Sequence, residues 1–221
     1  MPSLIPDITY MLISLPAIVI GFTFHEYAHA KVADWLGDPT PAYQGRLTLN
    51  PLAHIDVLGF ILLLFAGFGW AKPVQINPLR FRGDRSRGIM LVSLAGPLMN
   101  IVLAFIGALI YYLVISNQAM GMRNQVIALE LLRPLIRINV VLAAFNLIPV
   151  PPLDGSKILA GLLPGRQSGL FYTLETHGTL ILLVLIATGA IGWLLNPLTN
   201  VIISLISTSA HSLATVLLKL L

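Results

Sequence analysis

The stretch 89–115 contains no charged residue over 27 positions, and this restricts the fold more than any other feature of the chain. At 1.5 Å per residue, a helix of this length covers about 40 Å, more than the roughly 30 Å hydrocarbon core of a bilayer. Charged residues make up only 10% of the 221 residues, against about 25% in soluble domains, and 57% are apolar. The sequence therefore predicts an all-α polytopic membrane protein, a bundle of about five to six membrane segments forming one domain over 1–221.

The distribution of basic residues predicts how the chain is oriented. The net charge is +4, and most lysines and arginines lie between apolar runs, which indicates the positive-inside bias rather than nucleic-acid binding. No lysine or arginine precedes Lys31, so we expect the N-terminus outside and the first helix, about 7–36, running towards the cytoplasm of a cell membrane. The N-terminus lacks the basic region of a signal peptide, so this helix is interpreted as retained. Cysteine is absent, which excludes disulfides and thiol chemistry.

Near its end the first helix contains the sequence His25-Glu26-Tyr27-Ala28-His29. Residues four apart leave the same helix face, so both imidazoles can bind one metal ion, and Glu26 can take a proton from a metal-bound water. Buried structural histidines are the alternative. Ionisable groups at membrane depth cost roughly 2.5–3.5 kcal/mol and are usually functional, which favours zinc.

Between the first helix and the 89–115 helix lies a region that is too short and too broken to cross the membrane. The stretch 38–54 is predicted to be a loop with a short strand at about Arg46–Leu49. The run 57–68 covers only about 18 Å as a helix, and 69–78 is predicted to be extended between prolines. We therefore expect a small re-entrant and β-strand region at about 45–77.

A second broken region lies at 146–155, where three prolines and a glycine exclude a regular helix. It interrupts a predicted crossing at 138–163, whereas 125–137 is expected at the interface or against protein. Broken backbone at membrane depth must be buried in protein or line a cavity, so Asp154 is predicted to be the third zinc ligand. The ligands reach one depth only if 57–68 dips in and returns, so that the helix containing Asn100 runs outward.

The C-terminal part is predicted to contain a loop at 164–177, a crossing at Gly178–Leu195 ended by Asn196-Pro197, and a last helix at 198–218. We expect the catalytic core at about 7–163 and the C-terminal helices at about 168–221. Polar residues at helical spacing in the last helix predict a helix-contact face or an interfacial helix. They are Asn200, Ser204, Ser207, Thr208, His211 and Thr215. His211 and His177 are predicted to be structural.

Three motifs together resemble the site-2 protease family of intramembrane zinc metalloproteases, in its small form without a PDZ domain. They are His25-Glu26-x-x-His29, Gly96-Pro97-x-x-Asn100 and Asn146-x-x-Pro149-x-Pro151-x-Leu153-Asp154-Gly155. The resemblance covers roughly residues 15–163. From the residues alone, packing explains Gly96 and Pro97 at least as well as catalysis does.

The resemblance implies one Zn²⁺ ion held by His25, His29 and Asp154, with Glu26 as general base. It implies that Asn146 steadies the substrate or the developing oxyanion. Residues implied to contact an unwound substrate are Val74, Gln75 and Ile76 in an edge segment, together with Asn100. The stretch 46–56 resembles one in small prokaryotic members, and its role is not assigned. Its polar residues include Asn50, His54 and Asp56, and His54 is a candidate extra ligand.

The resulting hypothesis is an intramembrane zinc endopeptidase. It would cleave transmembrane protein substrates within the lipid bilayer, for regulated intramembrane proteolysis or for clearance of membrane remnants. The family suggests anti-sigma factors or leftover signal peptides. A metal-binding transporter and a non-catalytic membrane scaffold are the alternatives, although no internal repeat supports a transporter. The sequence leaves open whether the protein forms a homo-oligomer or has an accessory membrane partner.

Overall fold

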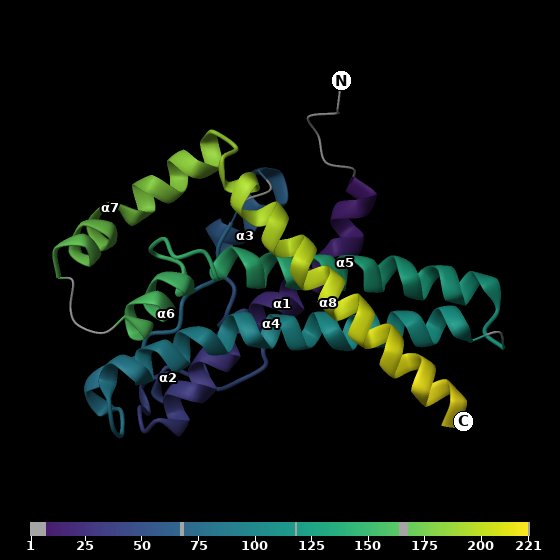
Figure 1. Ribbon diagram of the computed structural model, residues 1–221, viewed down its shortest axis with the longest axis horizontal. Coiled ribbons are helices and arrows are strands. Elements are labelled where there is room, and N and C mark those ends of the chain that lie inside the picture. The colour runs from purple at the N-terminus through teal and green to yellow at the C-terminus, as the bar shows by residue number, and fades with distance from the viewer. Residues whose placement is uncertain (1–7, 67–68, 118, 164–167, 221) are drawn as a thin grey trace.

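The computed structural model describes residues 8–66, 69–117, 119–163 and 168–220, which are mostly helical (Figure 1). Within these residues, three helices are long and apolar enough to cross a membrane: Thr9–Trp35, Arg85–Ser116 and Ile191–Leu220. The predicted all-α polytopic membrane protein is therefore confirmed. The elements in order are α1 (Ile8–Trp35), α2 (Thr40–Tyr43), η1 (Pro51–Ala53), α3 (Val57–Ala66), η2 (Pro78–Arg80), α4 (Arg85–Ser116), α5 (Met122–Asn146), α6 (Asp154–Leu162), α7 (Ser168–Ala187) and α8 (Ile191–Leu220).

Helices α1, α4 and α5 pack together at the centre of the molecule. The Asn100 amide of α4 bonds to the Gly21 carbonyl of α1, whereas Val92, earlier in α4, contacts His29, later in α1. Helix α4 therefore runs antiparallel to α1. Asn100 also contacts Asn139 of α5, which returns alongside α4 in Figure 1. These directions are the ones required for the three ligands to meet.

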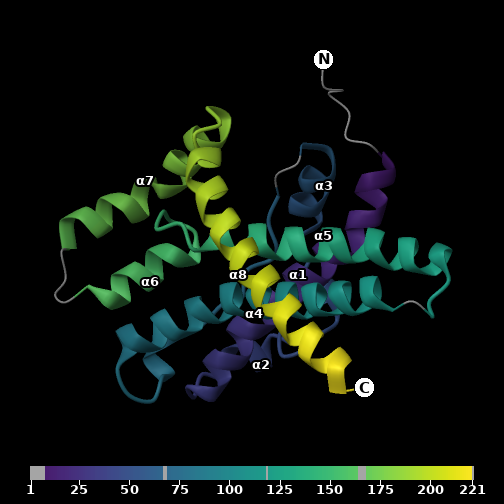
Figure 2. The ribbon, with the colours of Figure 1, turned by 45° about the vertical axis from the view of Figure 1, so that its right-hand side comes forward.

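Helix α8 crosses over α4 and α5 diagonally, as the two ribbon views show (Figures 1 and 2). Small side chains at the crossing let the helix backbones approach closely, as is typical of packed membrane helices. The buried cluster there consists of Ala104, Ala108, Val140, Ala144, Ile202, Ile206 and Ala210. These contacts pack the C-terminal helix α8 against α4 and α5.

The segment around α3 follows the dip-and-return path predicted for 57–68. Helix α3 has ten residues, too few to cross a bilayer, and the predicted run extends into residues 67–68, outside the described part. Ile55, before α3, forms an isolated antiparallel bridge with Ala71, after it. The Lys72 N–H also donates to the His54 carbonyl over 2.9 Å. The two ends of this hairpin therefore lie at the same level.

The strand predicted at Arg46–Leu49 is wrong, since the described residues contain this isolated bridge but no strand. The segment is a loop because local contacts use its backbone. The Arg46 N–H donates to the Pro41 carbonyl after a turn in which Gly45 has φ 66°, and the Thr48 carbonyl accepts from the His54 side chain.

The crossing predicted at 138–163 is also wrong. Helix α5 is continuous over Met122–Asn146 and lies along α4, so it includes the stretch 125–137. Its charges are tolerated because Glu130 and Arg133 pair at 3.0 Å on the exposed side, while Pro134 is buried. Irregular backbone follows Asn146, and the separate nine-residue helix α6 begins at Asp154.

The C-terminal boundaries differ from the prediction as well. Helix α7 begins inside the predicted loop and ends at Ala187, and α8 runs through Asn196-Pro197. The break lies instead near Gly189, whose φ of 73° favours glycine. The predicted polar stripe is not the contact face, because its members are mostly exposed. The buried positions of α8 are Thr199, Ile202, Ile206, Ala210 and Ala214.

Candidate metal centre

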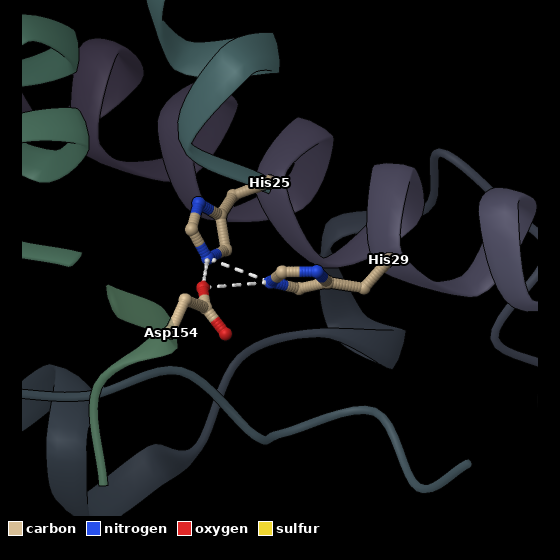
Figure 3. Close-up of side chains that lie close together, drawn as sticks. All are labelled: His25, His29 and Asp154. Atoms are coloured by element: carbon tan, nitrogen blue, oxygen red, sulfur yellow. Dashed lines mark hydrogen bonds and ion pairs between the residues drawn. The ribbon is translucent and has the colours of Figure 1, made fainter. Parts of the chain in front are cut away.

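Three side chains from two separate helices converge on one point (Figure 3). His25 and His29 come from α1, and Asp154 is the first residue of α6. The two histidine Nε2 atoms lie 3.0 Å apart, and Asp154 Oδ2 lies 3.3 Å from Nε2 of His25 and 3.1 Å from Nε2 of His29. All three residues are largely removed from solvent. The structure thus brings together the three ligands predicted from the sequence.

The hydrogen bonds on the far side of each imidazole determine which nitrogen faces the centre. His29 Nδ1 lies 2.7 Å from the Val92 carbonyl, which can only accept, so this nitrogen donates. His25 Nδ1 lies 2.7 Å from Asn100 Oδ1, whose own amide nitrogen donates to the Gly21 carbonyl and to Asn139. In the neutral rings, both Nε2 lone pairs therefore point at the Asp154 carboxylate. Three acceptors facing one another form a site that a bound metal cation satisfies.

The donor set and its spacing fit zinc. Zinc–nitrogen bonds of about 2.0–2.1 Å in tetrahedral geometry place neighbouring ligand atoms about 3.3 Å apart, close to the separations seen here. Two histidines and one carboxylate are a catalytic zinc set, which leaves a fourth position open. Within the described residues, these three form the group of histidine and acidic side chains placed to hold a metal ion.

Gly96 makes room for the two imidazoles. A Cβ atom at this position would lie 2.5 Å from His29 Nε2 and 2.6 Å from His25 Cε1, well inside van der Waals contact. The predicted close helix approach at Gly96 is thus an approach of α4 to the metal ligands themselves.

A cavity of about 370 Å³ opens beside the ligands. Its lining includes Glu26, Asn146, and Val74 and Ile76 of the segment that returns from α3. The Asn146 side chain donates to the Leu142 carbonyl at 3.0 Å, at the last turn of α5. A larger groove of about 470 Å³ lies between α4, α5 and α8, and the predicted metal and catalytic residues do not line it.

The Glu26 carboxylate contacts the segment that returns from α3. Its Oε2 accepts the Val74 backbone N–H at 3.0 Å and lies 3.7 Å from Arg46 Nη2. Glu26 is buried, with 8% of its surface exposed. Both contacts involve one carboxylate oxygen, which leaves Oε1 as the atom to face a reacting group.

Asn100 lies behind a metal ligand and outside the cavity lining, and its predicted contact with substrate stays a prediction. It is fully buried behind His25 and does not line the cavity, so its hydrogen bonds orient a ligand. Gln75 is exposed and accepts from the Gln44 side chain, whereas its neighbours Val74 and Ile76 line the cavity.

Three polar residues of the 46–56 stretch support local structure. Asn50 accepts the Leu52 N–H and Asp56 accepts the Gly59 N–H, at the starts of η1 and α3. His54 contacts the Thr48 carbonyl through Nε2 and is not part of the metal group. His211 packs its ring against Tyr112, with centroids 5.0 Å apart, in keeping with a structural role.

The sequence does not mark the groups that hydrogen-bond or pair with Glu26 and with the metal ligands. Arg46 beside Glu26, Asn139 behind Asn100, and the Val92 carbonyl behind His29 all act across long separations in the chain. Because such contacts depend on tertiary packing, no local motif marks them. The resemblance of residues 46–56 to a stretch of small family members was the only signal near Arg46.

The comparisons with known proteins agree with the geometry. The family model for peptidase family M50 matches residues 114–187, which include Asn146 and Asp154. "Putative zinc metalloprotease YwhC" of Bacillus subtilis is 42% identical over 197 residues, covering 86% of each chain. The chain belongs to peptidase family M50. It is a zinc metalloprotease of the site-2 type that binds one zinc ion.

Two more distant relatives have similar names. "Putative zinc metalloprotease MJ0611" of Methanocaldococcus jannaschii is 31% identical over 167 residues, covering 69% of this chain and 72% of the relative. "Putative zinc metalloprotease Rip2" of Mycolicibacterium smegmatis is 30% identical over 176 residues, covering 78% of this chain and 66% of the relative. No solved structure gives a significant match.

Proposed function

We propose that this zinc metalloprotease hydrolyses peptide bonds within or near transmembrane segments of other proteins. One observation carries the proposal: a three-acceptor metal centre and an adjacent carboxylate share a cavity enclosed by long apolar helices. A peptide bond must enter that cavity to react, and its position among membrane helices favours membrane-embedded substrates.

The chain's own side chains supply the proton transfers. When bound, zinc acts as a Lewis acid that makes a water molecule nucleophilic at neutral pH. Glu26 accepts the proton of the attacking water and passes it to the leaving amine. Asn146, at the edge of the same cavity, donates to the developing oxyanion through its amide nitrogen.

The substrate helix has to unwind, because a transmembrane helix hides its peptide bonds. Exposed backbone groups are costly in a bilayer, so an unwound segment needs partners. The return segment 71–77 has no regular structure, and Val74 and Ile76 face the cavity. The other backbone groups of this segment can pair with the substrate as an added strand. The Val74 N–H is not among them, because it already donates to Glu26.

The proposed setting is a cell membrane, with the N-terminus outside and the site nearer the cytoplasmic surface. The basic residues before α4 support this orientation through the positive-inside bias. Substrate classes consistent with the site are the membrane anchors of regulatory proteins, such as anti-sigma factors, and remnants of signal peptides. A homo-oligomer or an accessory membrane protein would be a further partner.

The test is cleavage of a panel of tagged single-pass membrane proteins by the purified, zinc-loaded protein in detergent or vesicles. Glu26→Gln is the matched variant, because it preserves the shape of the side chain and the three ligands while removing the base. We expect cleavage by the parent protein, loss with Glu26→Gln, and loss on adding a zinc chelator. Equal cleavage by the parent and Glu26→Gln would contradict the assigned role of the carboxylate.

A further inference from the structure

The loop between α2 and α3 contains a buried cation that contacts the proposed base. Arg46 has only 4% of its surface exposed, and its Nη2 lies 3.7 Å from Glu26 Oε2. The same Nη2 donates to the carbonyl of Lys72, two residues before Val74. The Val74 N–H in turn donates to the oxygen of Glu26 that faces Arg46. One guanidinium therefore contacts both the base and the segment that holds the base.

His54 fixes the other end of this loop. It is fully buried, its Nε2 lies 2.7 Å from the Thr48 carbonyl, and its own carbonyl accepts the Lys72 N–H at 2.9 Å. Burial lowers the pKa of the imidazole more than its hydrogen bond raises it, so the ring is neutral and Nε2 is the donor. The loop and the return segment are thus joined through both backbone groups of Lys72, whose N–H donates to the His54 carbonyl and whose carbonyl accepts from Arg46.

The arrangement leaves two buried polar atoms without partners among the described residues: Arg46 Nε and His54 Nδ1. Buried donors and acceptors are normally paired, because each loses its hydrogen bonds to water. A buried guanidinium with an unpaired Nε costs free energy. The contacts of its Nη2 with Glu26 and with the Lys72 carbonyl are the ones that give this buried charge its partners.

We propose that Arg46 is a positioning residue for the general base. It holds the Glu26 carboxylate by charge and holds the return segment by its hydrogen bond to the Lys72 carbonyl, so that Oε1 stays directed at the reacting water. This inference rests on the proposed peptidase function. It also couples substrate binding to proton transfer, because the return segment proposed to bind the substrate is the same segment that orients Glu26.

The experiment compares steady-state cleavage by Arg46→Gln and Arg46→Lys with the parent protein, on a substrate that the parent cleaves. Arg46→Gln should lower kcat about 100-fold, the scale expected when a catalytic group is misplaced by about 1 Å. The KM should stay within about threefold and the zinc content at about one per chain, since neither variant touches a ligand. Arg46→Lys keeps the charge but has a single nitrogen, so its kcat should be intermediate. Arg80→Gln, which removes an exposed cation beyond the return segment, is the control and should leave kcat unchanged.

The outcomes separate this inference from the proposed function. No cleavage by the parent protein would count against the peptidase proposal itself. Cleavage by the parent and loss with Glu26→Gln, but a normal kcat with Arg46→Gln, would overturn the role of Arg46 alone. Loss of zinc, or a raised KM with unchanged kcat, would show that Arg46 supports only the fold or the substrate edge. If Arg46→Gln does not fold, an unchanged kcat in Arg46→Lys overturns the inference and a reduced kcat at full zinc content supports it.

Discussion

At the scale of single residues, the metal centre depends on Gly96, where a larger side chain would collide with the imidazoles of His25 and His29. A methyl group at Gly96 would lie 2.5 Å from His29 Nε2, and the helix backbone cannot move away without separating α4 from α1. We predict that Gly96→Ala loses most of its bound zinc and its peptidase activity. Gly192→Ala is the control, because its Cβ would lie 3.9 Å from the nearest atom. Zinc measured by elemental analysis in the folded variants tests this; a full zinc content in Gly96→Ala would be inconsistent with the geometry.

Asn100 gives a second prediction at this scale. Its Oδ1 accepts the proton of His25 Nδ1 and so fixes the ring with Nε2 towards the metal. Removing such a support typically lowers metal affinity about 10- to 100-fold. We expect a reduction of this size in Asn100→Ala, measured by competition with a zinc chelator. Asn200→Ala, at an exposed position of α8, should retain the parent affinity. An unchanged affinity in Asn100→Ala would remove the orienting role.

Residue by residue, the sequence predicts the reactive groups better than their supports. The four-residue spacing of His25 and His29 within one helix fixes their shared face. The carboxylate of Asp154 lies in broken backbone at membrane depth, which indicates that it binds a cation. The contact of Asn100 with His25 has no local signature, because the two residues lie 75 positions apart in the chain. Arg46 had no local signature at all. Contacts of this kind depend on how helices pack, which periodicity does not encode.

At the scale of elements, the α3 hairpin positions both the edge segment and the base. Gly59 is where its two arms touch, since a Cβ atom there would lie 2.3 Å from the Trp70 carbonyl oxygen. We predict that Gly59→Ala spreads the hairpin and lowers the cleavage rate about 10- to 100-fold, because the return segment moves relative to Glu26. Zinc content should stay near one per chain, as the ligands lie on other elements.

The control for the hairpin is Gly121→Ala, whose Cβ would meet no atom within 4 Å. It should cleave at the parent rate. If Gly59→Ala also cleaves at the parent rate while remaining folded, the hairpin does not position the base. If it loses zinc, the effect reaches the ligands and the hairpin has a broader structural role.

Element types were predicted more accurately than element ends. Apolar runs gave both ends of α1 and the C-terminal end of α4 to within one residue, because uncharged stretches of that length have few alternatives. Helix α4 begins four residues before the predicted position, at Arg85. The charges of α5 suggested a segment at the interface or against protein; the helix is continuous through 125–137 and packs along α4, and Glu130 pairs with Arg133. Pro197 suggested a helix end, yet α8 continues through it, although a proline at the seventh residue of a helix removes one intrahelical hydrogen bond. The strand predicted at 46–49 did not form, because the described part of the chain offers it no partner strand.

At the scale of the whole molecule, the packing requires α1 and α5 to run in one direction and α4 in the other. The chain contains no cysteine, so single cysteines report on topology without background. Arg80→Cys and Ala119→Cys place exposed thiols before and after α4. We expect a membrane-impermeant maleimide to label Ala119→Cys in intact cells and Arg80→Cys only after permeabilisation. Labelling of both from one side would show that α4 does not cross the membrane.

The overall arrangement followed from requiring three ligands to meet at one depth. That requirement selected the dip-and-return path of α3 and the alternating directions of α1, α4 and α5 before any contact was known. The position of α8 across α4 and α5 did not follow from it, because the polar stripe on α8 suggested the wrong contact face. Its actual contact face consists of residues such as Ile202, Ile206 and Ala210, which fit against the alanines of α4 and α5.

The proposed chemistry depends on His25, His29 and Asp154 together holding one zinc ion. The most direct test is the zinc content of the purified, folded protein, measured beside His29→Ala, Asp154→Ala and Glu26→Gln. We predict about one zinc per chain in the parent protein and in Glu26→Gln, and little zinc in the two ligand variants. A folded parent protein without stoichiometric zinc, or full occupancy in Asp154→Ala, would contradict the account.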